Sequence, residues 1–174
     1  LYSVTGETIE RPTQEAEGNV VVIQKGGYDH MMRKEIAEGP SVIVSTTRGR
    51  LLPEVGNVKL GGLEVMLERL SKLRRITIVG CGSAHYAGTV GSWMLEEYAG
   101  IPTQNRLGSD YHHRRILENG DSAVLAISQS GSTLDTRTCV QHAKKHGLLT
   151  LGIVNKVGGA IARETDAGIY NHAG

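Results

Sequence analysis

The sequence has little of several features that define other classes of protein. It has no phenylalanine and one tryptophan, which argues against an aromatic platform of the kind on which proteins stack single-stranded nucleic acid. Its two cysteines, Cys81 and Cys139, lie far apart without metal-site or disulfide-framework spacing, which favours a reducing, cytoplasmic setting. No apolar run approaches the roughly 20 residues of a membrane helix. No signal-peptide pattern opens the chain, and we expect no membrane partner.

Charge of neither sign is in excess. The 174 residues include 19 basic and 18 acidic ones, and the formal net charge is +1. This balance argues against a nucleic-acid-binding surface, so any bound anion has to be held by local groups. Hydrophobic residues make up 39% of the chain, enough for the core of one domain of ordinary size. Because the chain starts at Leu1 and not at methionine, we expect a piece of a longer protein.

The first 27 residues differ in pattern from the rest. A Thr-Gly turn signal within residues 1–12 and the β-branched run at 20–24 predict a small hairpin and a short strand. Residues 1–27 are therefore predicted to be a linker or the tail of a preceding domain, and residues 28–174 to be the main domain.

A helical pattern opens the main domain. Tyr28, Met32 and Ile36 recur at intervals of four residues, which predicts an amphipathic helix. The Gly39-Pro40 pair is predicted to end this helix, because both residues interrupt helical backbone.

From Arg75 onward, short apolar runs alternate with helical patterns. Five runs have the composition of strands, namely residues 76–80, 103–107, 122–128, 148–154 and 167–171. The helix after the first run is predicted to face the core with Ala87, Val90, Met94, Leu95 and Tyr98, and the helix after the third with Thr136, Cys139, Val140 and Ala143. Alternating strands and helices form right-handed crossovers and a parallel sheet. The predicted fold class is α/β, a three-layer αβα sandwich with a mainly parallel sheet of about five strands.

Two strand-to-helix turns have the composition of an anion-binding site. They read VGCGSAH (residues 79–85) and ISQSGST (residues 127–133). In open parallel sheets, ligands bind at the carboxyl ends of the strands, where free amides and the helix dipole attract anions. Gly131 lets the backbone approach a ligand closely, and polar donors stand at Ser128, Gln129, Ser130 and Thr133. Neither turn contains Lys or Arg, so the predicted site holds a phosphate with dipoles and hydroxyls.

Other interpretations fit these turns less well. Ser132 and Asp135 have the spacing of a capping box, which accounts for one hydroxyl but not for four donors. The lysine of a P-loop and the flanking glycines of a nucleophile elbow are missing. GCGSAH begins like a dinucleotide-binding fingerprint but has His85 at the third glycine position, and no acidic residue ends the second strand. A nicotinamide site is the weaker alternative.

The remaining reactive side chains have structural explanations. Cys81 is predicted to be a small buried thiol and not a nucleophile, because no histidine is evident as its partner. His112 and His113 are adjacent, so on a helix they point to different faces and make poor joint metal ligands. Arg114 and Arg115 beside them are predicted to form a solvated or interface face. We expect no metal and no cofactor.

Several segments together resemble a known family. The segments GCGSAHYAG, SDYHHR, ISQSGSTLDT and TDAGIYNHAG are similar to the first sugar-isomerase (SIS) lobe of the glutamine–fructose-6-phosphate aminotransferases (isomerizing). Upstream, KGGYDHMMRKEIAEGP and VKLGGLEVML resemble the segment by which those enzymes leave their glutaminase domain. The resemblance covers essentially the whole chain.

The resemblance implies a function and assigns residues to it. Enzymes of this family make glucosamine 6-phosphate from fructose 6-phosphate and glutamine in cytoplasmic amino-sugar biosynthesis, with a glutaminase domain, two SIS lobes of flavodoxin-like topology and usually a homodimer. The substrate-binding residues implied here are Ser83, Ala84, Ser128, Gln129, Ser130 and Thr133, and the supporting loop residues are Cys81, Gly82, Gly131 and Ser132. The implied partners are a hexose 6-phosphate, glutamine used by the glutaminase, and a second copy of the chain.

This sequence departs from the family pattern at three positions. Ala84 stands where the family usually has serine, and Ser132 stands where it often has glutamate. Asp110 replaces a residue that is usually glutamate. Loss of a charge-assisted hydrogen bond at position 84 typically costs about 1.5–3 kcal/mol. The family's catalytic lysine, glutamate and histidine lie beyond the last residue, so we expect no catalytic residue here and no turnover by this chain alone. A non-catalytic, sugar-phosphate-sensing SIS domain is the alternative.

Overall fold

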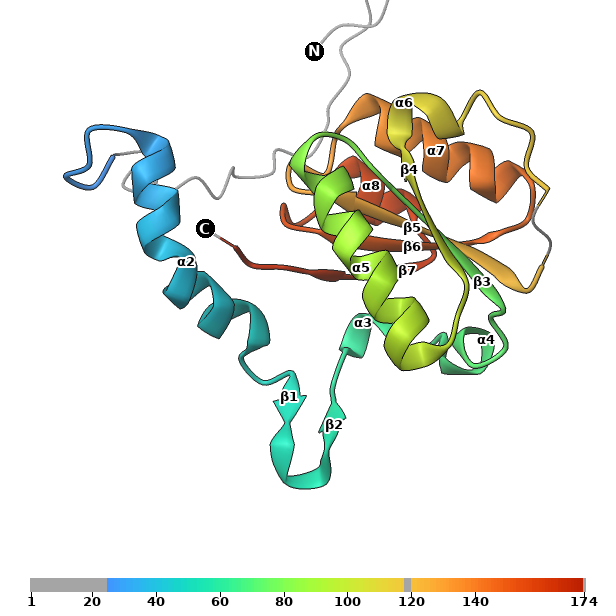
Figure 1. The fold of residues 1–174 in the computed structure, drawn as a ribbon, viewed down its shortest axis with the longest axis horizontal. Helices are drawn as coiled ribbons and strands as arrows, with labels where there is room; N and C mark the ends of the chain where they lie inside the picture. Colours follow the sequence, from blue (N-terminus) through green and yellow to red (C-terminus); the bar gives the residue numbers. More distant parts are fainter. Residues whose placement is uncertain (1–24, 118–119, 174) are drawn as a thin grey trace, which may run out of the picture. The chain divides into compact units, whose positions relative to one another are not determined.

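The computed structural model describes residues 25–117 and 120–173 (Figure 1). Contacts divide the chain into two units, Leu1–Pro40 and Ser41–Gly174. The hairpin and strand expected near the N-terminus lie outside the described residues, and the domain boundary expected after residue 27 stays a prediction.

A long helix, α2 (Met31–Thr47), includes residues of both units. Pro40 lies inside this helix, so the prediction that Gly39-Pro40 ends it is wrong. A proline removes one backbone donor but has a helical φ, and here the helix continues past it. No residue of α2 is buried, and Met32 and Ile36 are each 72% exposed.

The second unit is built on a parallel sheet of five strands in the order β4-β3-β5-β6-β7. The strands are β3 (Arg75–Gly80), β4 (Thr103–Leu107), β5 (Ser122–Ser128), β6 (Leu149–Val154) and β7 (Ala167–Tyr170). In the parallel register, Val79 of β3 pairs with Arg106 of β4 on one side and with Ala126 of β5 on the other. The strand order is that of flavodoxin-like folds, in which the first strand lies between the second and the third. It confirms the predicted fold class.

Helices cover both faces of the sheet (Figure 1). On one face lie α5 (Ser83–Ala99), α3 (Gly61–Glu64) and α4 (Leu67–Leu70), and on the other lie α6 (Gly108–Tyr111), α7 (Leu134–Lys145) and α8 (Ala160–Glu164). Along β5, Val124 and Ala126 belong to the core cluster beneath α7, whereas Ala123 and Leu125 belong to the cluster beneath α3 and α4. This alternation is expected of a strand that is buried on both faces.

The helices α7 and α5 meet the sheet in different ways. The buried residues of α7 are the four predicted from the sequence, Thr136, Cys139, Val140 and Ala143. The buried residues of α5 are Gly88 and Ser92, whereas Val90, Met94 and Tyr98 are 51%, 53% and 81% exposed. The predicted inward face of α5 is therefore wrong, because the small residues of this helix make its contact with the sheet.

A short hairpin follows α2. It consists of β1 (Leu51–Leu52) and β2 (Asn57–Val58), joined by the 3-10 helix η1 (Pro53–Val55). Just before it, the Thr46 hydroxyl donates to the carbonyl of Asn171 at 2.7 Å, and the Arg50 guanidinium donates to the carbonyl of Tyr170. These bonds attach the segment before the hairpin to the end of β7. Among the described residues, no helix is both long and apolar enough to cross a membrane.

Candidate functional site

The two polar turns predicted from the sequence lie at neighbouring strand ends. β3 ends at Gly80 and β5 ends at Ser128, and the two strands are parallel neighbours. The next strand in the sequence, β4, pairs with β3 on the side opposite to β5. The strand order therefore reverses between β3 and β5. Such a switch point leaves a crevice at the carboxyl ends of the strands, where open α/β sheets bind their ligands.

The turn between β5 and α7 brings three hydroxyl groups together. Thr133 Oγ1 lies 3.3 Å from Ser128 Oγ and 3.3 Å from Ser130 Oγ. Ser128 is buried, and its Oγ also accepts a 3.0 Å bond from the N–H of Gly131. Ser128 therefore holds the loop in shape, while Ser130 and Thr133 are only partly buried. We call residues 128–133 the hydroxyl cradle.

Gly131 is required by the packing of the cradle. Its φ of +65° is a backbone conformation that side chains with a Cβ rarely adopt. A Cβ at this position would lie 2.9 Å from Cγ1 of Val154 and 3.1 Å from Cα of Gly159. The cradle therefore rests directly on the segment that follows β6.

The N-terminus of α7 begins at the cradle. Thr133 is the N-cap residue, and it makes no side-chain capping bond. Ser132 precedes the cap, is exposed, and directs its N–H and its hydroxyl toward Ser130 Oγ at 3.3 and 3.4 Å. A capping box between Ser132 and Asp135 is thus not formed. The positive end of the dipole of this 12-residue helix faces the cradle without a side-chain cap.

The second turn joins β3 to α5. Gly82 is the N-cap of α5 and has a φ of +56°. Ser83 is exposed and Ala84 is half-buried. A Cβ on Gly80 would lie 3.1 Å from the carbonyl carbon of Ala84, so this turn folds tightly back on the end of its strand. Cys81 is half-buried, and its Sγ lies 3.6 Å from Thr136 Oγ1 at the start of α7.

The structure adds a third segment to the site, residues 155–156, which was not predicted from the sequence. The N–H groups of Asn155 and Lys156 donate to the carbonyls of Ser128 and Gln129, both at 3.2 Å. The side chain of Asn155 is itself fixed by the backbone of Ala173, to which it donates at 2.8 Å and from which it accepts at 2.6 Å. The glycine pair after Val157 was the available signal, because such pairs mark turns at strand ends.

Three titratable side chains with shifted pKa values, one buried and two nearer the surface, lie on α7 and α8 outside the cradle. Burial raises the pKa of the Cys139 thiol to about 12, so this side chain is a neutral core residue that donates to the Gly108 carbonyl at 3.1 Å. At the outer face of α7, hydrogen bonding to Glu164 raises the pKa of Arg137, and the same bond lowers the pKa of Glu164. No three His, Cys, Asp or Glu side chains of the described residues gather as a metal site.

This fold and these turns define a class of protein. Residues 69–174 match the family model of the SIS domain. The chain belongs to the SIS domain family.

Within that family the similarity extends to one kind of enzyme. The chain is 41% identical to the glutamine–fructose-6-phosphate aminotransferase (isomerizing) of Chlorobaculum tepidum, over 99% of this chain and 29% of that enzyme. It is 38% identical to aminotransferase 2 of Mus musculus, over 94% of this chain and 24% of that enzyme. The solved C-terminal domain of the aminotransferase from Francisella tularensis is 30% identical with a TM-score of 0.79, covering 87% of this chain and 42% of that one. The chain thus spans less than a third of the curated enzymes it matches.

Proposed function

We propose that this chain is the sugar-phosphate-binding SIS lobe of an enzyme that makes glucosamine 6-phosphate from fructose 6-phosphate and glutamine. The observation that carries the proposal is the hydroxyl cradle, which lies at the switch point of the sheet and at the N-terminus of α7. A phosphate dianion there meets hydroxyl donors, backbone amides and the helix dipole, without the need for a cationic side chain.

Each predicted site residue has its own part in this proposal. Ser130 and Thr133 donate their hydroxyls to the phosphate, and Gln129 is exposed at the rim of the cradle. Ser128 and Gly131 hold the shape of the cradle through the bond between them. On the neighbouring turn, Ser83 offers its hydroxyl to the sugar or its phosphate, and Ala84 offers only its backbone N–H. Cys81, Gly82 and Ser132 support the two loops.

The rest of the parent enzyme is part of the same proposal. The aminotransferases that this chain resembles are three to four times as long as the matched segment. We therefore place the glutamine-using domain and the catalytic groups outside this chain, and we expect the chain alone to be inactive. We also propose a cytoplasmic location and a homodimer, the latter supported by the apolar side chains that α5 exposes.

Calorimetry tests the cradle directly. Fructose 6-phosphate, glucosamine 6-phosphate and inorganic phosphate are titrated into the chain and into Thr133→Ala. Loss of a hydroxyl that donates to a phosphate should weaken binding by about 1.5–3 kcal/mol, roughly ten- to a hundredfold. Thr138→Ala is the matched control, because Thr138 lies in the helix that Thr133 caps and, in the part of the chain that the structure describes, its hydroxyl bonds only to the carbonyl of Leu134.

The possible outcomes are distinct. Sugar-phosphate binding that weakens in Thr133→Ala but not in Thr138→Ala supports the cradle. Ala84→Ser should then tighten binding by about tenfold or more, because it adds a hydroxyl donor to the second turn. If neither the natural chain nor Ala84→Ser binds sugar phosphate at millimolar concentration, the cradle alone is not a binding site and the proposal for this lobe fails.

A further inference from the structure

A basic pocket lies away from the cradle, beside the edge strand β4. Its volume is about 380 Å³, and four of its lining residues are arginines, namely Arg75, Arg106, Arg114 and Arg115. It shares no residue with the cradle or with the turn between β3 and α5. Pockets of this volume are of the size that takes a small molecule.

The register of the sheet explains why these arginines meet. Arg106 and Gln104 are two residues apart on β4, so both point to the face that α6 and α7 cover. Asn105 between them points to the other face, where its amide donates to the carbonyl of His85 at 2.8 Å and to Thr89. Arg75, at the start of β3, faces the same side as Arg106, and Arg114 and Arg115 come to this side from the segment after α6.

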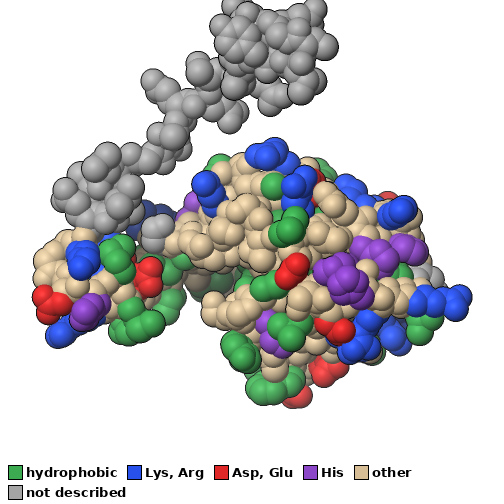
Figure 2. Space-filling model, turned by 90° about the horizontal axis from the view of Figure 1, so that it is seen from above, with side chains coloured by type: hydrophobic (Ala, Val, Ile, Leu, Met, Phe, Trp, Pro, Cys, Tyr) green, Lys and Arg blue, Asp and Glu red, His purple; other side chains and the backbone are tan. Residues whose placement is uncertain are grey.

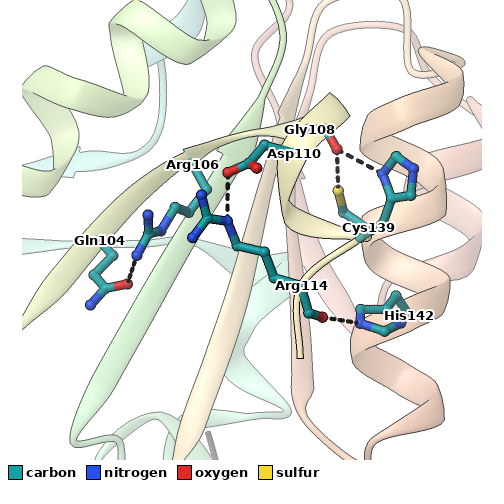
Figure 3. A network of polar contacts seen from close by, with 8 residues as sticks. Gln104, Arg106, Gly108, Asp110, Arg114, Cys139 and His142 are labelled. Carbon is teal, nitrogen blue, oxygen red and sulfur yellow. Dashed lines mark hydrogen bonds and ion pairs between the residues drawn. The ribbon is translucent and has the colours of Figure 1, made fainter. Parts of the chain in front are cut away.

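The pocket has an excess of positive charge among the residues that the structure describes. Among the four pocket arginines, only Arg114 has a carboxylate partner within the described residues, namely Asp110 at 2.7 Å. Arg106 donates to the neutral side-chain oxygen of Gln104 at 2.9 Å, and Figure 3 shows this pair next to Arg114 and Asp110. No ion pair within these described segments neutralises Arg75, Arg106 or Arg115. Three of the four guanidinium groups that line this hollow thus have no carboxylate partner within the described segments, in a chain whose formal net charge is only +1.

We propose that the basic pocket binds a small polyanion of the polyphosphate class, either free or carried by a nucleotide. A guanidinium offers a planar fork of donors that fits phosphate oxygens in pairs, and several such forks around one pocket match a ligand with several phosphate oxygens. The aromatic side chain of Tyr111, which belongs to the core and lines the pocket, gives it a rigid wall. This site goes beyond the proposed sugar-phosphate function and does not depend on it.

Isothermal calorimetry with pyrophosphate and with ADP tests the proposal on the 174-residue chain. Both probes should bind, and Arg75→Gln, Arg106→Gln and Arg115→Gln should each weaken binding by about tenfold, the effect of one charge-assisted hydrogen bond. Arg74→Gln is the matched control for Arg75→Gln, because Arg74 is adjacent in the sequence but lies outside the pocket, 4.0 Å from Asp121. It should bind as the natural chain does. Tighter binding of ADP than of pyrophosphate would identify a nucleotide site, and equal binding a polyphosphate site.

The cradle variant separates this site from the sugar-phosphate site. Thr133→Ala should leave pyrophosphate binding unchanged, and the pocket variants should leave fructose 6-phosphate binding unchanged. Thermal melting confirms that each variant is folded, which is expected because Arg75 and Arg115 are exposed.

The proposal is overturned if neither probe binds at millimolar concentration, if Arg74→Gln weakens binding as much as Arg75→Gln, or if only Thr133→Ala weakens it. In that case the arginines serve only to keep the edge strand from pairing with other chains.

Discussion

At the scale of the residue, the side chain of Asp166 holds several elements together near the edge strand β7. Its carboxylate accepts bonds from the N–H and the hydroxyl of Thr150 at 2.9 and 2.8 Å, and it pairs with Lys144 at 2.9 Å. Partial burial works to raise the pKa of Asp166, but these donors and the positive charge outweigh it, and the pKa is lowered. The carboxylate thereby joins β6, the C-terminal part of α7 and the start of β7.

The lowered pKa of Asp166 predicts a pH-dependent loss of stability. Ionised Asp166 favours the folded state, so its contribution is present above the ordinary value of 3.8 and disappears as the pH falls through the lower folded value. Asp166→Asn should lower the free energy of unfolding by about 1.5–2 kcal/mol at neutral pH, the lower part of the range for bonds to charged groups. We expect this lower part because the side chain is 24% exposed.

Urea denaturation from about pH 7 to about pH 2 measures this effect. The difference between the natural chain and Asp166→Asn should shrink below the ordinary pKa. Asp121→Asn is the control, because Asp121 is 40% exposed and lies 4.0 Å from its partner Arg74. A difference that stays constant over the whole pH range would show that Asp166 acts through its shape and not through its charge.

At the scale of the element, the cradle loop depends on the close contact between Gly131 and Gly159. Gly131→Ala introduces a Cβ into a left-handed backbone and against Val154 and Gly159, whereas Gly147→Ala introduces it into a left-handed backbone with open space around it. We expect Gly147→Ala to cost about 1 kcal/mol and Gly131→Ala about 2–4 kcal/mol, the excess being the cost of packing. Chemical denaturation gives both values, and equal values would mean that the segment after β6 moves aside without cost.

The two long helices of the sheet domain show what the sequence could predict and what it could not. On α7, medium-sized side chains recur at helical spacing, and Thr136, Cys139, Val140 and Ala143 are buried as predicted. On α5, a Cβ at Gly88 would lie 2.6 Å from Oδ1 of Asn105 and 2.9 Å from Cγ2 of Ile78. The helix approaches the sheet through its smallest residues, so a rule that places large apolar residues inside gives the opposite face.

The same distinction applies to the candidate site. The residue types and their place after a strand were enough to predict that Ser128, Ser130 and Thr133 would lie together. In the structure, the hydroxyl of Thr133 lies 3.3 Å from each of the two serine hydroxyls. The choice of N-cap could not be predicted, because Ser132 and Thr133 are both good caps and only the loop geometry selects Thr133. The segment after β6 joins the site through backbone groups, so its sequence signal is limited to the turn-forming glycine pair after Val157.

At the scale of the molecule, the outward face of α5 is largely apolar, with Glu97 as an exposed charge among its side chains. Tyr86, Trp93 and Tyr98 are 72%, 64% and 81% exposed, and Val90 and Met94 are about half exposed, at 51% and 53%. Figure 2 shows apolar side chains at the surface of the described residues, next to charged ones. Contiguous aromatic and aliphatic groups on one helix are typical of a surface that is covered in an assembly.

This face provides the test of the proposed homodimer. If a second copy covers α5, Trp93→Glu places a charge in an apolar contact and should weaken association by at least about tenfold, as expected for an aromatic residue at the centre of an interface. Sedimentation equilibrium measures the association. Trp93 is the only tryptophan of the sequence, so its emission should also shift to shorter wavelength as the natural chain is concentrated.

Leu134→Glu is the control, since Leu134 is 71% exposed on a different helix. A chain that stays monomeric and keeps a solvent-exposed Trp93 emission at all concentrations would contradict the homodimer, because the aromatic residues of α5 would then remain in water.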